Sequence, residues 1–198
     1  MNKPHPNPCS IWVKPLFLLR TWLFLLLLSA LGTIQSANAQ THGLTSTWSM
    51  APNNATFMNT TNHLTRGMTY NPATGHLLVV SRTPTATQTN AIYVLDSTTG
   101  ATLGTLPFDS GLITGGTFPI NMVGVTTDGV IYVCNLTTDS TNVSSGPFKL
   151  YRWANESASA TLAYTGDPSF LNTNGASPRR FGDSMAVRGT GAGTQILL

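Results

Sequence analysis

One pattern of short strands and turns occurs twice in this chain, and it constrains the fold more than any other feature. Residues 91–106 read as a tight β-hairpin, because two segments rich in apolar and β-branched residues flank a turn that ends at Gly100. Residues 67–81 have the same form, with Pro72 and Gly75 in the turn. The two hairpins together predict a unit of four short antiparallel strands over residues 67–106.

The same order of strands returns roughly 53 to 60 residues further along the chain. The second unit spans residues 122–165 and has strands at 124–127, 130–134, 148–153 and 160–164. A third unit, residues 184–198, holds two strands and reaches the last residue, Leu198. No amphipathic helix follows residue 39, so the sequence predicts an all-β protein.

The strands also indicate how the units pack. Residues 130–134 are apolar at successive positions, so both faces of their sheet need cover, and neighbouring sheets can provide it. Four-stranded units at this period are typical of β-propeller blades, of which a ring usually has about four to eight. We therefore predict an incomplete β-propeller of about two and a half blades, which is the N-terminal piece of a longer product or completes a ring with other chains. A β-sandwich is the competing architecture, because strands and turns at this spacing also fit it.

The N-terminus has the features of a targeting signal. Residues 1–39 contain a positively charged leader, a short apolar run over 22–31, and the small residues Ala37 and Ala39 in the positions of a cleavage site. We predict a signal peptide over residues 1–39, with an uncleaved N-terminal anchor as the alternative. The mature protein is then secreted or extracytoplasmic, with no membrane span after cleavage. Residues 40–66 are expected to be an irregular lead-in that contains a candidate closing strand.

The charge balance argues against a nucleic-acid partner. Charged residues make up 9% of the chain, against about 25% in typical soluble domains. Three of the 10 Lys and Arg residues and none of the 7 Asp and Glu residues lie in the leader, so 7 of each remain after it. The predicted mature chain is formally neutral and lacks the basic surface expected of a DNA or RNA binder.

Two groups of motifs carry a family resemblance. Residues 91–100 and 128–135 resemble the repeats of surface-layer-type propellers, which have a Tyr-Val-Thr-Asn-like strand and an Asp-x-x-x-Gly hairpin. The longer pattern over residues 64–198, most specifically 180–198, resembles an uncharacterised domain family of exported bacterial proteins. The resemblance implies secretion and a propeller-like fold, and it brings no established activity, ligand or catalytic residue. Members of that family run well beyond Leu198.

Signatures of common enzyme classes are missing. The sequence has no His-Glu-x-x-His, Gly-x-Ser-x-Gly, Walker or paired-Cys motif, so we predict no cofactor and no metal site. His42, His63 and His76 are expected to be solvated, and Cys134 is expected to be a buried structural thiol. Asp96 and Asp128 are expected to cap turns. Two carboxylates that are far apart in the sequence can still lie close together in the fold and act as a glycosidase pair.

One cluster of charges stands out in so uncharged a chain. Arg179, Arg180 and Asp183 precede the first strand of the third unit, and Arg188 follows it. Guanidinium groups suit the recognition of carboxylates or sugar acids, and Trp153 or Tyr151 is the candidate stacking face. The alternative is a structural Arg-Asp pair that bridges adjacent blades.

Two functional hypotheses remain from the sequence. The first is a non-catalytic binding or scaffold module of a larger exported protein, with an unknown carbohydrate or protein ligand and further blades or chains as partners. The second is a propeller enzyme, such as a lactonase, lyase or glycan hydrolase, whose catalytic residues lie on blades missing from this chain.

Overall fold

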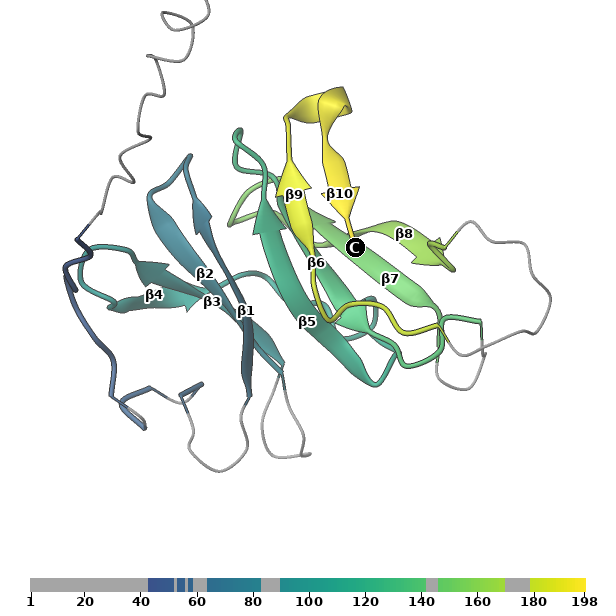
Figure 1. The fold of residues 1–198 in the computed structure, drawn as a ribbon, viewed down its shortest axis with the longest axis horizontal. Coiled ribbons are helices and arrows are strands. Elements are labelled where there is room, and N and C mark those ends of the chain that lie inside the picture. Colours follow the sequence, from purple (N-terminus) through teal and green to yellow (C-terminus); the bar gives the residue numbers. More distant parts are fainter. Residues whose placement is uncertain are drawn as a thin grey trace, which may run out of the picture. The chain divides into compact units, whose positions relative to one another are not determined.

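A computed structural model describes most of the chain after residue 42 (Figure 1). The described residues are 43–51, 53–55, 57–58, 64–82, 90–141, 146–169 and 179–198. Thr45–Leu198 form one compact unit. The predicted signal peptide, His42 and His63 lie outside the described residues. No helix within the described ranges is long and apolar enough to span a membrane.

The first sheet has four antiparallel strands in sequence order. They are β1 (Thr65–Asn71), β2 (His76–Ser81), β3 (Ala91–Asp96) and β4 (Thr102–Thr105). The turn between β1 and β2 closes with a hydrogen bond from the Gly75 amide to the Asn71 carbonyl, 2.9 Å long, and Gly75 has a φ of 76° that favours glycine. Asp96 caps the next turn, since its Oδ1 accepts hydrogen bonds from the amides of Thr98 and Thr99.

The second sheet repeats this arrangement. Its strands are β5 (Phe118–Val125), β6 (Ile131–Leu136), β7 (Phe148–Trp153) and β8 (Thr161–Gly166). The register shifts once between β1 and β2 and once between β5 and β6, in each case before the last four residue pairs. It also shifts between β3 and β4 and between β7 and β8. The two sheets therefore share irregularities between the same pairs of strands, which supports a true structural repeat.

The last described residues form a hairpin of β9 (Ala186–Arg188) and β10 (Gln195–Leu197), joined by a loop with a short 3-10 turn over Gly191–Gly193. Figure 1 shows this hairpin in yellow. The segment just before it pairs with the residue that directly follows β6, because Thr137 and Phe181 form an antiparallel bridge. At the other end of the hairpin the Thr127 amide donates to the Gly189 carbonyl at 3.3 Å, so the third unit contacts the second sheet at both ends.

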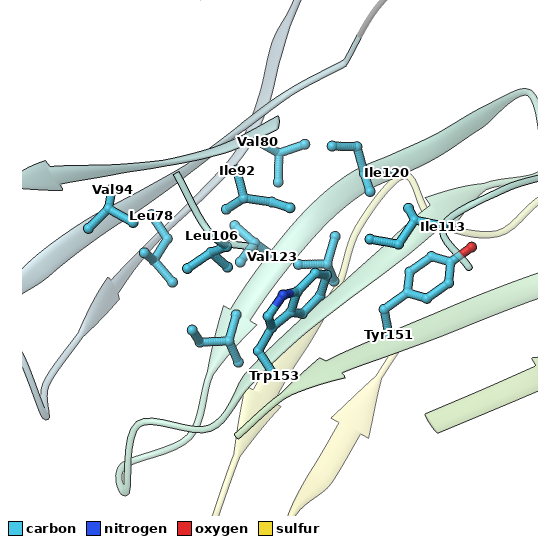
Figure 2. Close-up of a cluster of buried hydrophobic side chains, with 12 residues drawn as sticks. Leu78, Val80, Ile92, Val94, Leu106, Ile113, Ile120, Val123, Tyr151 and Trp153 are labelled. Carbon is cyan, nitrogen blue, oxygen red and sulfur yellow. The ribbon is translucent and has the colours of Figure 1, made fainter. Parts of the chain in front are cut away.

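A large core lies between the two four-stranded sheets. Figure 2 shows Leu78, Val80 and Ile92 of the first sheet facing Val123 and Trp153 of the second. The other faces are also covered. Phe57 packs on Val79 and Leu95 of the first sheet, while Phe181, Met185 and Ile196 pack on the second. Burial on both faces confirms the prediction that these strands need cover on each side.

Two glycines allow the first strands of successive units to approach closely. A Cβ at Gly67 in β1 would lie 2.7 Å from the backbone nitrogen of Val123 in β5. A Cβ at Gly124 in β5 would lie 2.5 Å from a methyl carbon of Val187 in β9. Real Cβ atoms do not come so near to other heavy atoms, so glycine sets the spacing of β1, β5 and β9.

The all-β prediction is confirmed, with four-stranded antiparallel sheets in the predicted order. The bounds of β7 match the predicted ones, and β2 ends at residue 81, where the predicted hairpin over residues 67–81 ends. β5 is the main difference, since it begins at Phe118, before the predicted start of the second unit at residue 122. A candidate closing strand was expected within residues 40–66, and the described residues of that range before β1 contain no strand.

Candidate anion-binding site

Arg180 and Asp183 form a local ion pair in the segment before β9. Arg180 donates from Nε to Oδ2 at 2.5 Å and from Nη2 to Oδ1 at 2.7 Å. The two side chains are 53% and 54% exposed, and they are three residues apart in the sequence. The hydrogen bonds from Arg180 hold the pKa of Asp183 below its ordinary value. The pair is a forked contact within one loop at the surface and does not bridge two sheets.

Arg179 has a different setting from its neighbour. Its guanidinium pairs with the Asp167 carboxylate and donates to Oγ of Ser169 at 2.8 Å. Its carbonyl accepts a hydrogen bond from the Ser140 amide at 2.8 Å. Arg179 therefore ties together the loops that follow β6 and β8, and its side chain is only 14% exposed.

The other predicted site residues lie elsewhere. Arg188 is at the end of β9 away from Asp183, where it donates to Gln195 at 2.7 Å. Trp153 is completely buried, and its indole N–H donates to the Pro107 carbonyl at 2.9 Å. Tyr151 is also fully buried, and its hydroxyl donates to the Thr114 carbonyl. Both rings belong to the core in Figure 2 and present no face to solvent.

The structure brings a residue from the first sheet to the Arg180 loop. Arg82 directly follows β2, and its amide donates to the Leu64 carbonyl at 3.1 Å. Its guanidinium carbon lies 3.7 Å from the centre of the Phe118 ring at the start of β5. Its Nη1 donates to Oδ1 of Asn121 at 2.8 Å. Stacking and hydrogen bonding thus orient this guanidinium against the second sheet.

Asn121 carries the connection on to the third unit. It is 2% exposed, and its Nδ2 donates to the Gly182 carbonyl at 2.6 Å. Gly182 has a φ of 97°, and a Cβ there would lie 1.9 Å from the Asn135 carbonyl oxygen, so only glycine fits. Arg82, Asn121 and Gly182 therefore link all three sheets at one end, with Arg180 and Asp183 on either side of Gly182.

Positive charge is in excess at this end. Burial of the Arg82 guanidinium and the positive charges of Arg66 and Arg180 place the pKa of Arg82 below its ordinary value, although the Asp183 carboxylate acts in the opposite direction. We refer to Arg66, Arg82, Asn121, Arg180 and Asp183 as the Arg82 site. Arg180 and Arg82 both act on the Asp183 carboxylate, and Arg66 adds a third positive charge near Arg82, so an added anion relieves like-charge repulsion.

The donor set indicates which anions suit the Arg82 site. A guanidinium fork matches the two oxygens of a carboxylate, and Asp183 already occupies the Arg180 fork in this way. Arg66 is exposed on β1. An external carboxylate is therefore expected to contact Arg66 and Arg82, and to compete with Asp183 for Arg180.

A second polar cluster corrects an expectation about His76. This residue was expected to be solvated, but its Nδ1 lies 2.7 Å from Oε2 of Glu156, and its side chain is 30% exposed. Oε1 of Glu156 accepts hydrogen bonds from Thr74 at 2.6 Å and Asn71 at 2.7 Å. All donors are on the first sheet and Glu156 is on the second, so this cluster joins the two sheets.

The remaining side chains that could act as a nucleophile or a metal ligand have structural roles. Cys134 is buried, and burial raises the pKa of its thiol to about 12. In the part of the chain that the structure describes, no group of three or more His, Cys, Asp and Glu side chains can hold a metal ion.

Sequence reasoning identified Arg180 and Asp183 but missed Arg82, Arg66 and Asn121. Arg82 and Asn121 are 39 residues apart, on different sheets, and no short motif connects them. The sequence offered one signal for these residues, which is the small number of charged side chains. Because arginines are few, the position of each one within the predicted repeat could have been compared.

Comparison with known proteins identifies the family. A comparison with curated proteins gives no match. A crystal structure of a DUF4623 family protein from Bacteroides eggerthii DSM 20697, at 1.91 Å resolution, is similar, with 26% sequence identity and a TM-score of 0.46. The similarity covers 62% of this chain and 26% of that chain, so the chain spans about a quarter of that protein's length. The family described as Domain of unknown function (DUF4623) matches residues 24–196. The chain belongs to the DUF4623 family.

Proposed function

We propose that this chain is part of an exported β-propeller that binds a carboxylate-bearing carbohydrate at the Arg82 site and does not catalyse a reaction. The observation that carries the proposal is the link from Arg82 through Asn121 to Gly182, which gathers arginines from different sheets at one end of the stack. Ligands commonly bind where loops from several repeated units meet.

The propeller part of the proposal is supported by the packing of the sheets. Successive sheets stack face to face, and their first strands approach one another at Gly67 and Gly124. In a propeller the first strands of all blades surround a central axis, which requires such close and regular spacing. In this architecture the Arg82 site lies at one mouth of the axis.

Export is supported by the sequence. The leader has the charge, the short apolar run and the small residues of a signal peptide. The low charge and the Thr-, Ser- and Asn-rich composition of the remaining chain fit a β-protein outside the cytoplasm.

The proposed ligand class follows from the excess of guanidinium groups. A sugar acid offers a planar carboxylate for Arg66 and Arg82 and hydroxyl groups for the polar surface around them. Exposed charges of this kind bind more weakly as salt increases. Binding of the ligand is therefore expected to depend on ionic strength.

Isothermal titration calorimetry of residues 40–198 with oligogalacturonate, against a neutral oligosaccharide of the same length, tests the proposal. We expect binding of the acidic probe only. Arg82→Gln and Arg66→Gln should each weaken it by about tenfold, the effect of losing one charge-assisted contact. Arg188→Gln is the matched control, because it removes an exposed arginine at the other end of β9. Equal binding of both probes, or equal loss in the Arg188 variant, contradicts the proposal.

A further inference from the structure

One edge of the Arg82 guanidinium group has no protein partner. Nη1 of Arg82 donates to Oδ1 of Asn121 at 2.8 Å, and the guanidinium carbon lies 3.7 Å from the centre of the Phe118 ring. Among the described residues, nothing accepts a hydrogen bond from its Nε or Nη2. Arg82 is only partly buried, and polar groups that are removed from water normally have partners. The edge formed by Nε and Nη2 is therefore met by solvent or by a ligand.

Arg180 shows what such an edge binds. It uses the same two nitrogens, Nε and Nη2, to hold both oxygens of Asp183 at 2.5 and 2.7 Å. The two donors lie in one plane and match the two oxygens of a carboxylate, so this contact recognises the shape of the anion as well as its charge. Arg82 offers the same pair of donors, while Arg180 already holds the Asp183 carboxylate. An external carboxylate is thus the group that fits the free edge of Arg82.

Asn121 fixes the direction of this edge. It is 2% exposed, and its Nδ2 donates to the Gly182 carbonyl at 2.6 Å. A carbonyl can only accept a hydrogen bond, so the amide must present Oδ1 to Arg82. A serine at this position lacks the amide and cannot bridge the two partners in this way. The hydrogen bond to Arg82 is therefore set by the fold before any ligand arrives.

Phe118 restricts the same guanidinium from another side. It lies at the start of β5, three residues before Asn121 in the same strand. The stacking contact limits the tilt of the guanidinium, and the hydrogen bond to Asn121 limits its rotation. A side chain that is already held in its binding conformation loses less entropy when a ligand binds, which strengthens binding.

We propose that Asn121 and Phe118 are positioning residues, which orient the Nε–Nη2 edge of Arg82 so that the Arg82 site selects carboxylates over other monovalent anions. The inference rests on the proposed function, because it concerns the same site. It deepens that function by assigning the selectivity to the contact with the anion, which is independent of the sugar that carries the carboxylate.

Acetate is the probe, because it carries the carboxylate without a sugar. Chloride is exchanged for acetate at constant ionic strength and neutral pH, and the arginine Nε–H signals of the protein are followed by NMR. Arg82→Lys identifies the Arg82 signal by its loss. We expect the signal to shift in a saturable way, because the exchange changes the shape of the anion and not its charge.

The acetate titration separates this inference from the proposed function. An Arg82 signal that acetate does not change overturns the inference, even if oligogalacturonate binds. A saturable shift in a protein that does not bind oligogalacturonate supports the oriented edge and contradicts the sugar-acid ligand.

Asn121→Ser and Phe118→Leu test the positioning role. Each variant keeps Arg82 and its charge, and each should weaken acetate binding by about threefold to tenfold, the cost of ordering one free side chain. Asn71→Ser is the matched control, because Asn71 is 1% exposed and bonds to Glu156 at the other end of β1. This control should keep the wild-type affinity for acetate.

Two results overturn the positioning role. One is wild-type affinity for acetate in Asn121→Ser or Phe118→Leu, and the other is an equal loss of affinity in Asn71→Ser. If Asn121→Ser does not fold, Phe118→Leu decides the outcome, because leucine keeps an apolar side chain at this position and removes only the aromatic face.

Discussion

His76 and Glu156 form a hydrogen bond between the two four-stranded sheets, with Nδ1 of His76 2.7 Å from Oε2 of Glu156. Glu156 also accepts hydrogen bonds from Thr74 and Asn71, so one carboxylate on the second sheet holds three side chains of the first. Burial acts to raise the pKa of Glu156, but the hydrogen bonds from Thr74, His76 and Asn71 outweigh it and the pKa is lowered.

This carboxylate makes stability depend on pH. The pKa of Glu156 is lower in the folded chain than in the unfolded chain, where it is about 4.5. The contribution of Glu156 to stability is therefore present above the unfolded pKa and is lost as the pH falls through the folded pKa. Glu156→Gln should lower the free energy of unfolding by about 1 to 3 kcal/mol at pH 7, and the difference should shrink in acid. Denaturant unfolding across the pH range measures this. Asp109→Asn, in an exposed turn, is the control, and a constant Glu156→Gln difference down to the lowest pH contradicts the prediction.

Replacement of Gly67 tests the spacing of the first strands. The added methyl group of Gly67→Ala would meet the β5 backbone at Val123, which cannot move away like a flexible side chain. We expect a loss of about 1 to 3 kcal/mol, typical of overpacking. Gly193→Ala adds the same methyl group where nothing lies within 4 Å and should change stability little. Thermal unfolding measures the stability of both variants. Equal losses of stability in Gly67→Ala and Gly193→Ala would contradict the steric explanation.

Trp153 is expected to stabilise the fold through its packing in the core. Trp153→Ala should cost about 3 to 5 kcal/mol, because it removes a fully buried ring from between the sheets. Trp48 provides a comparison, since its indole N–H bonds to Ser97 at 2.8 Å but its ring is only partly buried. Trp48→Ala should cost clearly less in the same denaturant titration. A small effect at Trp153 is incompatible with the central position in Figure 2.

Asp183 is expected to compete with an external anion. Asp183→Asn removes the carboxylate from the Arg180 fork, so affinity for oligogalacturonate should rise by up to about fivefold. Both partners are exposed, so the midpoint of thermal unfolding should change little. Calorimetric titration and thermal unfolding of the same variant give the two readouts. Lower affinity, or a large loss of stability, favours a structural role for the pair.

The features that the sequence predicted are those set by neighbours along the chain. Alternating and continuous apolar patterns located β2 and β7, and the turn chemistry of Asp96 was correct, because each depends on a few adjacent residues. β5 was placed too late because Pro119 and Asn121 interrupt the apolar pattern of its first half, where the register with β6 also shifts.

Contacts between sheets could not be predicted in the same way. His76 and Glu156 are 80 residues apart, and Arg82 and Asn121 are 39 apart. Their meeting depends on the stacking of whole sheets, which no local pattern encodes. The same reason explains why Trp153 was expected at a binding surface. Its position in β7 was correct, but the face on which it lies is set by the neighbouring sheet.

The burial of both faces of each sheet has a consequence for unfolding. The first sheet shares its largest core with the second, and the second shares its outer face with the β9–β10 hairpin. If one sheet separates, it exposes half of the apolar surface of its neighbour, which is then weakened in turn. Loss of structure in one sheet should therefore spread to the next, as in repeat proteins with nearest-neighbour coupling.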